Sequence, residues 1–521
     1  MSIIVSGISL PIFEDVNIAY RNAARICGVS LNEVVAREFK CSADARGHMP
    51  KFVRSIELDG IENEADIVKK IDRPNVKLHS HIDLESLVSN LPPSSARPIV
   101  VGFGPSGMFA ALTLALRGMA PIVLERGECL EERDGSVDIF YRQRRLNIDS
   151  NIQFGEGGAG AYSDGKLTTR INDPYCEAVL DAFVKNGAPS DILRNAKPHI
   201  GTDVLKPVVV NIRKQIERLG GRVLFKTRVD GLLLRAGRVI GVMTNNGDFE
   251  SDAVILAIGH SARDTAQILL DLGVEIHPKP FSMGVRIEHL QEDLDRSMYG
   301  KYAGNPLLPS AEYQLSYRNG ERACYSFCMC PGGSVVAAAS EYGRVVTNGM
   351  SRHARDGRNA NAALAVPVSV ESFPGGVLGG IDLARGVEAA AFLAGGSDYT
   401  APAQLVRDLL EGKPSRCGGR IKPTFPMGVR WGSLEGVLPD GFTDSLREGL
   451  LSFAKSIRCF GDGDAVMTAP ETRTSSPIRI PRNTDFSSLT YSGLYPCGEG
   501  AGYAGGIMSA AVDGIRIAMS L

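Results

Sequence analysis

The fold of this chain is decided by residues 98–127, which read PIVVGFGPSGMFAALTLALRGMAPIVLERG. Residues 98–101 are apolar and mostly β-branched without alternation, which is typical of a short buried strand. An alanine- and leucine-rich helix is predicted over residues 106–117, and residues 122–124 form a second apolar run that ends at Glu125. The stretch therefore predicts a strand, a helix and a second strand in direct succession.

The turn between the first predicted strand and the helix carries Gly102, Gly104 and Gly107, in the spacing G-x-G-x-x-G. The first glycine allows a tight turn, the second lets the backbone approach a pyrophosphate, and the third allows close packing of helix and strand. The N-terminus of the helix also directs free N–H groups and the positive end of its dipole at the phosphates. These features indicate a dinucleotide-binding turn.

The acid at the end of the second predicted strand strengthens this interpretation. Glu125 follows Gly107 by 18 residues, where a carboxylate can accept hydrogen bonds from ribose hydroxyls. The alternative is an ordinary β-α-β crossover that binds no ligand, and the complete succession of features disfavours it. The candidate cofactor contacts of this stretch are Gly102, Gly104, Pro105, Ser106, Gly107, Glu125 and Arg126.

The composition is that of an ordinary globular chain of 521 residues, with 44% hydrophobic and 22% charged residues. The net charge of −2 gives no long-range attraction to nucleic acid or to an anionic membrane. Residues 1–13 lack the basic segment of a signal peptide, and no apolar run reaches membrane-spanning length. Ten scattered cysteines without metal-ligand spacing fit reduced thiols, so we expect a cytoplasmic location and no metal site.

Residues 1–95 alternate between predicted strands and helices, which predicts a small α+β domain of ferredoxin-like type. Residues 91–98, LPPSSARP, have the composition of a linker. His79 and His81 are interpreted as a strand-end pair, because no convincing third metal ligand accompanies them. The expected strands are residues 2–10, 52–58 and 76–79, and the expected helices are residues 14–27, 31–38 and 64–71.

Residues 151–170, NIQFGEGGAGAYSDGKLTTR, are rich in glycine. Such a density usually marks a close approach to a ligand or a forced turn, and the alternative is a plain flexible loop. Asp164 and Lys166 flank Gly165 and can meet polar groups of a ligand. The candidate contacts here are Gly157, Gly158, Gly160, Asp164, Gly165, Lys166 and Leu167.

The segment that follows completes the first part of a dinucleotide-binding domain, expected over residues 97–272. Residues 252–257 read as a buried strand that runs into Gly259, which again brings backbone close to a cofactor at the carboxyl edge of a sheet. Val229 and Gly259 are the candidate contacts. The expected helix is residues 206–219, and the expected strands before the last are residues 222–226, 229–234 and 239–244.

Residues 273–426 have a different texture and are expected to form an inserted α+β substrate domain. Cys324, Cys328 and Cys330 share one face of a predicted strand, and C-x-C is a poor spacing for zinc. A redox thiol pair beside a cofactor is one hypothesis, and ordinary buried strand cysteines are the alternative that we favour. The expected strands are residues 282–287, 313–317, 323–328, 334–339 and 367–371, and the expected helices are residues 386–393 and 403–410.

The last segment, residues 427–521, is expected to return to the dinucleotide domain. A strand is predicted to end at Cys497, before the Gly498-Glu499 turn, and a helix is predicted over residues 507–520. A carboxylate at such a strand end can hold ribityl hydroxyls, and the helix N-terminus can stabilise negative charge on a reduced flavin. A terminal packing helix is the alternative. The candidate contacts are Gly498, Glu499, Gly505, Gly506 and Ile507.

Several of these motifs together resemble the FAD-dependent oxidoreductases with a glutathione-reductase-like Rossmann domain, most closely the bacterial FAD-dependent, or NAD(FAD)-utilising, dehydrogenases. The resemblance implies that Gly102–Gly107 binds the pyrophosphate of FAD and that Glu125 binds the adenosine ribose. It also implies that the glycine-rich loop and the terminal turn hold the ribityl chain and the flavin ring. Glu499 departs from the aspartate that is common there. The motifs are VVGFGPSGMFAAL, FGEGGAGAYSDGKLTTR, LAIGHSARDT, YSFCMCPGG, VVTNGMS with RDGRNANAAL, ETRTSSPIRI and YPCGEGAGYAGGI.

The expected function is an FAD-dependent oxidoreductase that transfers a hydride through flavin N5 to or from an unidentified small-molecule substrate. Because a second dinucleotide fingerprint is lacking, NADH or NADPH is expected to dock only transiently as reductant. The candidate catalytic residues are His260 as a proton donor, and Arg473 and Lys166 as binders of an anionic group. Each can instead serve as a cap or a structural hydrogen bond.

Two alternative functions remain at this stage. The protein can bind FAD as a structural or sensing ligand without turnover. It can also be an FAD-dependent modifier of a macromolecule, guided by a basic patch on the N-terminal domain. The residues that suggest such a patch are Lys51, Arg54, Lys69, Lys70 and Arg73.

Overall fold

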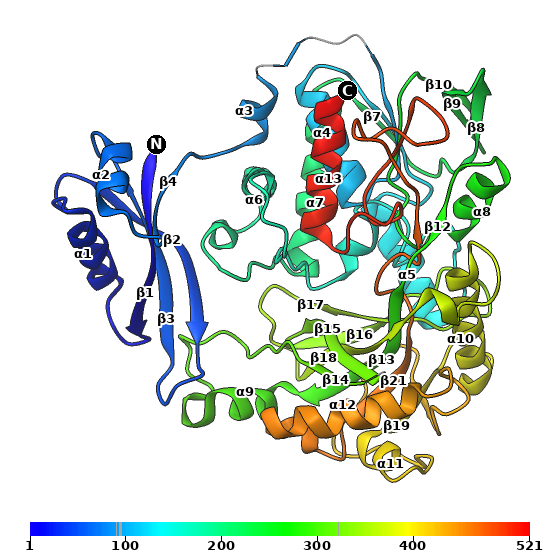
Figure 1. Cartoon of the computed structure of the whole chain (residues 1–521). Helices are drawn as coiled ribbons and strands as arrows, with labels where there is room; N and C mark the ends of the chain where they lie inside the picture. The colour runs from blue at the N-terminus through cyan, green and yellow to red at the C-terminus, as the bar shows by residue number, and fades with distance from the viewer. Residues whose placement is uncertain (90, 93–95, 321) are drawn as a thin grey trace.

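A computed structural model describes residues 1–89, 91–92, 96–320 and 322–521 of the protein. It is a mixed α/β fold with parallel and antiparallel sheets. Figure 1 shows a small N-terminal domain at one side, connected by α3 (Leu84–Val88) to the body of the molecule. The linker predicted over residues 91–98 falls partly on residues 93–95, which lie outside the described residues.

A parallel sheet of five short strands, in the order β23-β11-β5-β6-β7, lies at the centre of the nucleotide-type domain. Its strands are buried on both faces, which explains why they read as continuous apolar runs. Val100 joins the apolar cluster formed with the helices, whereas Ile99 and Val101 join the cluster on the opposite face. The strands are β5 (Ile99–Val101), β6 (Ile122–Leu124), β7 (Arg222–Leu224), β11 (Val254–Leu256) and β23 (Leu494–Pro496).

Helices cover one face of this sheet, and an antiparallel meander covers the other. Figure 1 shows the C-terminal helix α13 beside α4, which in turn contacts α7. A Cβ added at Gly514 would lie 2.1 Å from Ser106 O of α4, so α13 and α4 touch through their backbones. The helices of this domain are α4 (Pro105–Leu116), α5 (Leu130–Gln143), α6 (Tyr175–Lys185), α7 (Thr202–Arg218), α8 (Arg263–Asp271), which packs on the meander side, and α13 (Ile507–Ser520). The meander comprises β8 (Val229–Arg235), β9 (Arg238–Thr244) and β10 (Gly247–Glu250), and a small pair comprises β12 (His277–Pro278) and β22 (Ile478–Arg479).

The N-terminal domain has the element order βαββαβ and the sheet order β2-β3-β1-β4, a ferredoxin-like arrangement. The helix predicted over residues 31–38 is wrong, because β2 starts at Val35 and pairs along its length with β3. Tertiary pairing overrides the local helix preference of this segment. The elements are β1 (Ser2–Pro11), α1 (Val16–Cys27), β2 (Val35–Asp44), β3 (Lys51–Asp59), α2 (Glu64–Ile71) and β4 (Val76–His79).

The third region is built on a seven-stranded mixed sheet in the order β14-β15-β18-β13-β21-β19-β20, called here the mixed-sheet domain. Its core packs against α10 and α12. The strands are β13 (Phe281–Leu290), β14 (Ser316–Asn319), β15 (Arg322–Cys330), β18 (Asn359–Val368), β19 (Ala401–Leu405), β20 (Val429–Trp431) and β21 (Val466–Glu471), with the separate pair β16 (Gly333–Ala337) and β17 (Thr347–Ser351). The helices are α9 (Gln291–Tyr299), α10 (Gly379–Gly395), α11 (Val406–Leu410) and α12 (Phe442–Ser456).

Three expectations for this region need correction. The strand predicted at residues 367–371 is instead β18, whose alanine-rich sequence hides a central strand buried between β13 and β15. Residues 403–410 begin as strand and turn helical at Val406. The mixed sheet also continues past the expected boundary at residue 426, because β20 and β21 pair with β19. The sequence contains no sign that the chain returns to the mixed sheet, because long segments separate β19, β20 and β21.

Among the residues that the structure describes, no helix is long and apolar enough to cross a membrane.

Candidate functional site

The predicted contacts gather at one edge of the parallel sheet. Gly102, Glu125, Gly259 and Gly498 follow β5, β6, β11 and β23 respectively, so they lie beyond the carboxyl ends of four adjacent parallel strands. The chain leaves β5 toward β6 and β7 and later returns to the other side of β5 at β11, which makes this edge a topological switch point. Open α/β sheets bind their ligands in such a crevice. The fold therefore brings together segments that are up to 400 residues apart.

The fingerprint turn, the glycine-rich loop and the C-terminal helix meet at close range. An ideal Cβ on Gly158 would lie 2.9 Å from the Cα of Gly104. An ideal Cβ on Gly160 would lie 3.4 Å from Ile507 Cδ1 and 3.5 Å from Pro105 Cγ. Pro105 and Ile507 are the first residues of α4 and α13, so two helix N-termini converge here. Such termini favour negatively charged ligand groups.

Two glycines of the fingerprint are required by packing. Gly102 has φ +96°, and its Cβ would lie 2.4 Å from Ala257 O on the neighbouring strand connection. A Cβ on Gly107 would lie 2.0 Å from Gly102 O, where helix and strand touch. By contrast, the nearest atom to a Cβ on Gly104 is 3.8 Å away. Added Cβ atoms would meet nothing within 4 Å at Gly259, Gly505 and Gly506. The space beside Gly104 can therefore admit a pyrophosphate that approaches the backbone closely.

Glu125 is engaged by the protein itself. Its Oε1 accepts hydrogen bonds from the N–H groups of Gly127 and Gly155, each at 2.9 Å, and its Oε2 accepts one from Phe103 at 2.8 Å. A carboxylate offers about four acceptor positions, so one remains on Oε2. Glu125 therefore has room for one further hydrogen bond besides those from the protein. Sequence reasoning missed the structural role of Glu125 in joining the fingerprint turn to the glycine-rich loop.

Arg126 and Val229 are oriented by protein contacts. The Arg126 guanidinium donates to Asp149 at 2.8 Å and to Asp264 at 2.9 Å, and it lies over the Phe154 ring at 4.2 Å. Val229 begins β8 and is buried in the apolar cluster beneath the meander. The Arg126 guanidinium is therefore bound by two carboxylates of the protein, and the Val229 side chain is part of the apolar core.

The end of the glycine-rich loop is an ion-pair cluster. Asp164 is 1% exposed, accepts two hydrogen bonds from Arg355 and one from Ser351, and lies 2.9 Å from Lys166 Nζ. Burial opposes ionisation, but Lys166 and Arg355 outweigh it and lower the pKa of Asp164. The Asp164 carboxylate therefore binds side chains of the protein itself. Gly165 and Leu167 pair through their backbones with residues 198–200, and Lys166 keeps a 26% exposed side chain.

Glu499 differs from the other two candidate cofactor acids, Glu125 and Asp164, because it lacks a hydrogen-bond partner among the described residues. Among the described residues, its carboxylate has no hydrogen bond or ion pair within contact distance. Burial raises its pKa to about 8, Lys279 opposes this rise, and Cys328 adds to it. Gly498 packs its backbone against Ser106 of α4 and donates its N–H to Asp513 at 2.7 Å, which fixes the turn that carries Glu499. A half-buried, unpaired carboxyl group at this turn suits a hydroxyl-bearing ligand.

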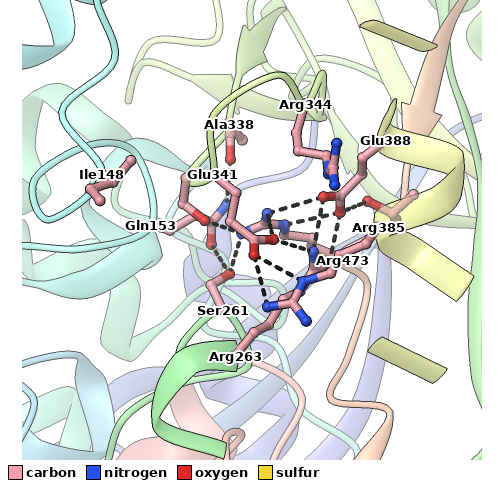
Figure 2. A network of polar contacts seen from close by, with 12 residues as sticks. Ile148, Gln153, Ser261, Arg263, Ala338, Glu341, Arg344, Arg385, Glu388 and Arg473 are labelled. Atoms are coloured by element: carbon pink, nitrogen blue, oxygen red, sulfur yellow. Dashed lines mark hydrogen bonds and ion pairs between the residues drawn. The ribbon is translucent and has the colours of Figure 1, made fainter. Parts of the chain in front are cut away.

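Arg473 lies in a buried polar network, which Figure 2 shows from close by. His260 joins this network through its Nδ1, which lies 2.9 Å from Ser261 Oγ. Arg473 lies 3.3 Å from both carboxylate oxygens of Glu388 and 2.9 Å from Ser261 Oγ. Arg263 donates to the same carboxylate at 2.7 and 2.9 Å. Burial and the charges of Arg473 and Arg263 lower the pKa of His260 to about 3. The further members of the network are Gln153, Ser340, Glu341, Arg385 and Thr472.

This network changes the roles expected for two residues. Arg473 is only 2% exposed in its side chain and shares Glu388 with Arg263, so it has the structural role rather than that of a free anion binder. His260 is neutral near pH 7, so it has no imidazolium proton to donate there. Glu388 and Arg263 were missed by sequence reasoning, because a charge inside an amphipathic helix gives no local sign of being buried.

A second buried pair was missed in the mixed-sheet domain. Arg286 lies in the middle of β13, is fully buried, and donates to Glu471 of β21 at 2.5 and 3.1 Å. Its Nη1 donates to Cys328 O at 2.8 Å. An arginine inside an apolar strand was the available signal in the sequence. It connects the core of the sheet to the strand that carries Cys328 and Cys330.

The His79 and His81 pair faces acids from α6. Glu177 Oε1 lies 3.2 Å from His79 Nε2 and 2.8 Å from His81 Nδ1. His81, Asp83 and Asp181 lie close enough together to hold an ion. Lys185 already neutralises this group, because its Nζ lies 2.8 Å from Asp181 and 3.1 Å from Asp83. We interpret these contacts as a junction between the N-terminal domain and α6.

The fold is that of a mixed α/β protein, in which a parallel-sheet domain is accompanied by the mixed-sheet domain. Residues 280–474, which cover that domain, match a family described as "FAD-dependent protein, C-terminal domain-like". The chain is 44% identical over 522 residues to an uncharacterized protein of Clostridium beijerinckii, covering 99% of this chain and 98% of that protein. It belongs to the same family as this Clostridium beijerinckii protein.

More distant similarities were also found. Protein FixC of Escherichia coli K12 is 26% identical over 200 residues, covering 37% of this chain and 42% of that protein. The crystal structure of L-proline dehydrogenase from P. horikoshii aligns with a TM-score of 0.34 and 12% sequence identity, covering 82% of this chain and 93% of that chain.

Proposed function

We propose that the protein is an FAD-dependent oxidoreductase that transfers a hydride through flavin N5 to or from a small-molecule substrate. The observation that supports this most directly is the convergence of three glycine-rich segments and two helix N-termini at the switch point of the parallel sheet. The family match of residues 280–474 agrees with it. When bound, FAD supplies a carrier that accepts and releases two electrons.

The residues divide into those that bind the cofactor and those that position its surroundings. Gly104 and the N-terminus of α4 bind the pyrophosphate, and Glu125 accepts one ribose hydroxyl through Oε2. Glu499 holds a hydroxyl of the ribityl chain, and the N-terminus of α13 stabilises negative charge at the ring. Lys166, whose side chain remains 26% exposed, holds an anionic group of the substrate.

The proposal is tested by the flavin content and reduction of the purified protein. We expect bound FAD in the isolated protein or after incubation with FAD. Anaerobic addition of NADH or NADPH, or of a small-molecule extract, is then expected to bleach the flavin absorbance band. FAD binding without bleaching by any of these would instead support a structural or sensing role.

The macromolecule-modifier alternative receives little support from the N-terminal domain. Its predicted basic patch includes Arg54, which is 8% exposed and donates to Glu38 at 2.6 Å. One of the five expected charges is therefore neutralised inside the domain. Deleting a charge at Lys69 or Lys70 tests what remains, and unchanged flavin reduction is expected.

A further inference from the structure

Strand β15 is distorted between two of its cysteines. Along the pairing with β18, Phe327 lies opposite Ala363 and Cys330 lies opposite Asn361. Three steps on β15 therefore face two steps on β18, which defines a β-bulge. Cys328, inside the bulge, has φ +44°, a conformation that is unusual for a residue other than glycine. Bulges are frequent next to active sites, where they redirect a side chain.

The bulge also places the second cysteine against the backbone of the first. Cys330 Sγ lies 3.4 Å from Cys328 O, to which its S–H can donate. In a regular strand, alternate Cα atoms are about 6.4–6.8 Å apart, at the upper end of the separation of about 4.4–6.8 Å that disulfides span. The extra residue contracts this part of the chain. The pair can therefore close with little movement of the backbone.

The electrostatic surroundings distinguish the two sulfurs. The neighbouring Cys330 side chain is the main cause that lowers the pKa of Cys328 to about 6, and Arg286 and Lys166 lower it further against burial. The Cys328 side chain and burial raise the pKa of Cys330. Cys328 is therefore the more acidic thiol of the pair. Cys324, on the same strand, differs, because burial raises its pKa to about 12.

The segment that carries the pair contacts a residue that binds the glycine-rich loop. A Cβ added at Gly332, two residues after Cys330, would lie 1.8 Å from Arg355 O, and Arg355 donates to Asp164 at the end of that loop at 2.6 Å. Lys166 of the loop lowers the pKa of Cys328, and Cys328 raises the pKa of Glu499 on the terminal turn. Cys328 is half-buried, whereas Cys330 is fully buried. The pair is therefore within electrostatic range of both segments assigned to the flavin.

We propose that Cys328 and Cys330 form a dithiol/disulfide pair that exchanges two electrons with the isoalloxazine ring of bound flavin. In one direction, reduced flavin gives up two electrons and two protons, the S–S bond breaks, and two thiols form. In the other, the thiols lose two electrons and two protons, the S–S bond forms, and the flavin is reduced. This inference rests on the proposed function, because the flavin is the electron partner.

The test uses the FAD-loaded full-length protein. Anaerobic titration with dithionite is expected to take up about four electrons per flavin after air oxidation, against about two for Cys328→Ser. Cys324→Ser is the matched control and keeps the wild-type value. Alkylation of the oxidised protein and mass mapping of residues 323–344 is expected to show a 328–330 link, about 2 Da lighter than the dithiol, with Cys324 free to react after unfolding.

Each result has a clear meaning. Uptake of about two electrons by FAD-loaded wild-type protein, with Cys328 and Cys330 both alkylated after oxidation, would overturn the inference and leave the proposed function intact. A protein that neither contains nor takes up FAD would overturn the proposed function, and the dithiol step with it. The mass measurement on the wild type does not depend on whether a variant folds.

Discussion

Arg355 holds the carboxylate of Asp164 with two hydrogen bonds, from Nε to Oδ1 at 3.1 Å and from Nη2 to Oδ2 at 2.6 Å. Asp164 ends the glycine-rich loop, and Arg355 follows β17 of the mixed-sheet domain. The side chains are 1% and 8% exposed. This buried pair therefore ties the proposed cofactor loop to the domain expected to bind the substrate, and it predicts a coupling between them.

Replacing Arg355 with alanine is expected to lower the free energy of unfolding by about 3–5 kcal/mol, because Asp164 is left buried without its main partner. The single tryptophan, Trp431 in β20, reports urea unfolding of the mixed-sheet domain by fluorescence. Arg142→Ala, which removes an exposed helical ion pair with Asp138, is the control and should cost about 0.3–0.5 kcal/mol. Equal effects of the two substitutions would contradict a structural role for the Asp164 pair.

Gly158→Ala is expected to reduce FAD binding more than tenfold, equivalent to about 1.4 kcal/mol or more. Its Cβ would lie 2.9 Å from the Cα of Gly104, and φ at this position is +59°, so the loop must move away from the fingerprint turn. Binding is measured by titrating FAD-free protein and following flavin fluorescence.

Gly135→Ala provides the control for this substitution. Gly135 lies inside α5, and a Cβ there would meet nothing within 4 Å. We expect unchanged FAD affinity and slightly higher stability, because alanine favours the helix by about 0.5–1 kcal/mol. Unchanged affinity in Gly158→Ala as well would show that the cofactor does not use the contact between the two turns.

Glu499 is expected to make the FAD-free protein less stable as the pH rises. Its pKa increases from 4.5 to about 8 on folding, chiefly through burial. Between these values the folded protein retains a proton that the unfolded chain releases, so the free energy of unfolding falls with pH by up to about 1.4 kcal/mol per unit. Glu499→Gln should remove this loss in urea unfolding from about pH 5 to about pH 8. Glu250→Gln, at an exposed acid of β10, should leave it in place.

His260 is expected to contribute a pH dependence of the opposite sign. Burial and the neighbouring arginines lower its pKa from 6.5 to about 3 on folding. In this window the unfolded chain binds a proton that the folded protein does not, so stability rises with pH until about pH 6.5. His260→Gln should flatten the acid side of the stability profile. A profile of FAD reduction that keeps its shape in this variant would agree with a neutral His260, whereas loss of a step near neutral pH would contradict it.

The sequence was sufficient for the elements with strong local signals. The strand, glycines, helix and second strand of residues 98–127 appear in the structure as β5, α4 and β6, because buried parallel strands and an all-apolar helix have distinctive patterns. Boundaries of α2, β4 and α13 agree with their predicted ranges. Residues 31–38 were wrongly predicted as a helix, because the edge strand there is defined by pairing with β3. The strand at residues 359–368 was not predicted, because alanine is unusual in a central strand.

The sequence alone thus determined which segments gather at the carboxyl edge of the parallel sheet, because glycine spacing and helix N-termini act locally. The tertiary structure alone decided how the charged side chains are used. Arg473 is bound by Glu388 of α10, His260 has its lowered pKa from burial and from Arg473, which is more than 200 residues away in the sequence, and Glu125 is engaged by two loops. The pairing partner and the burial of a charge depend on chain segments that meet only after folding, and the close contact of Cys328 with Cys330 depends on a bulge that only the pairing of β15 with β18 creates.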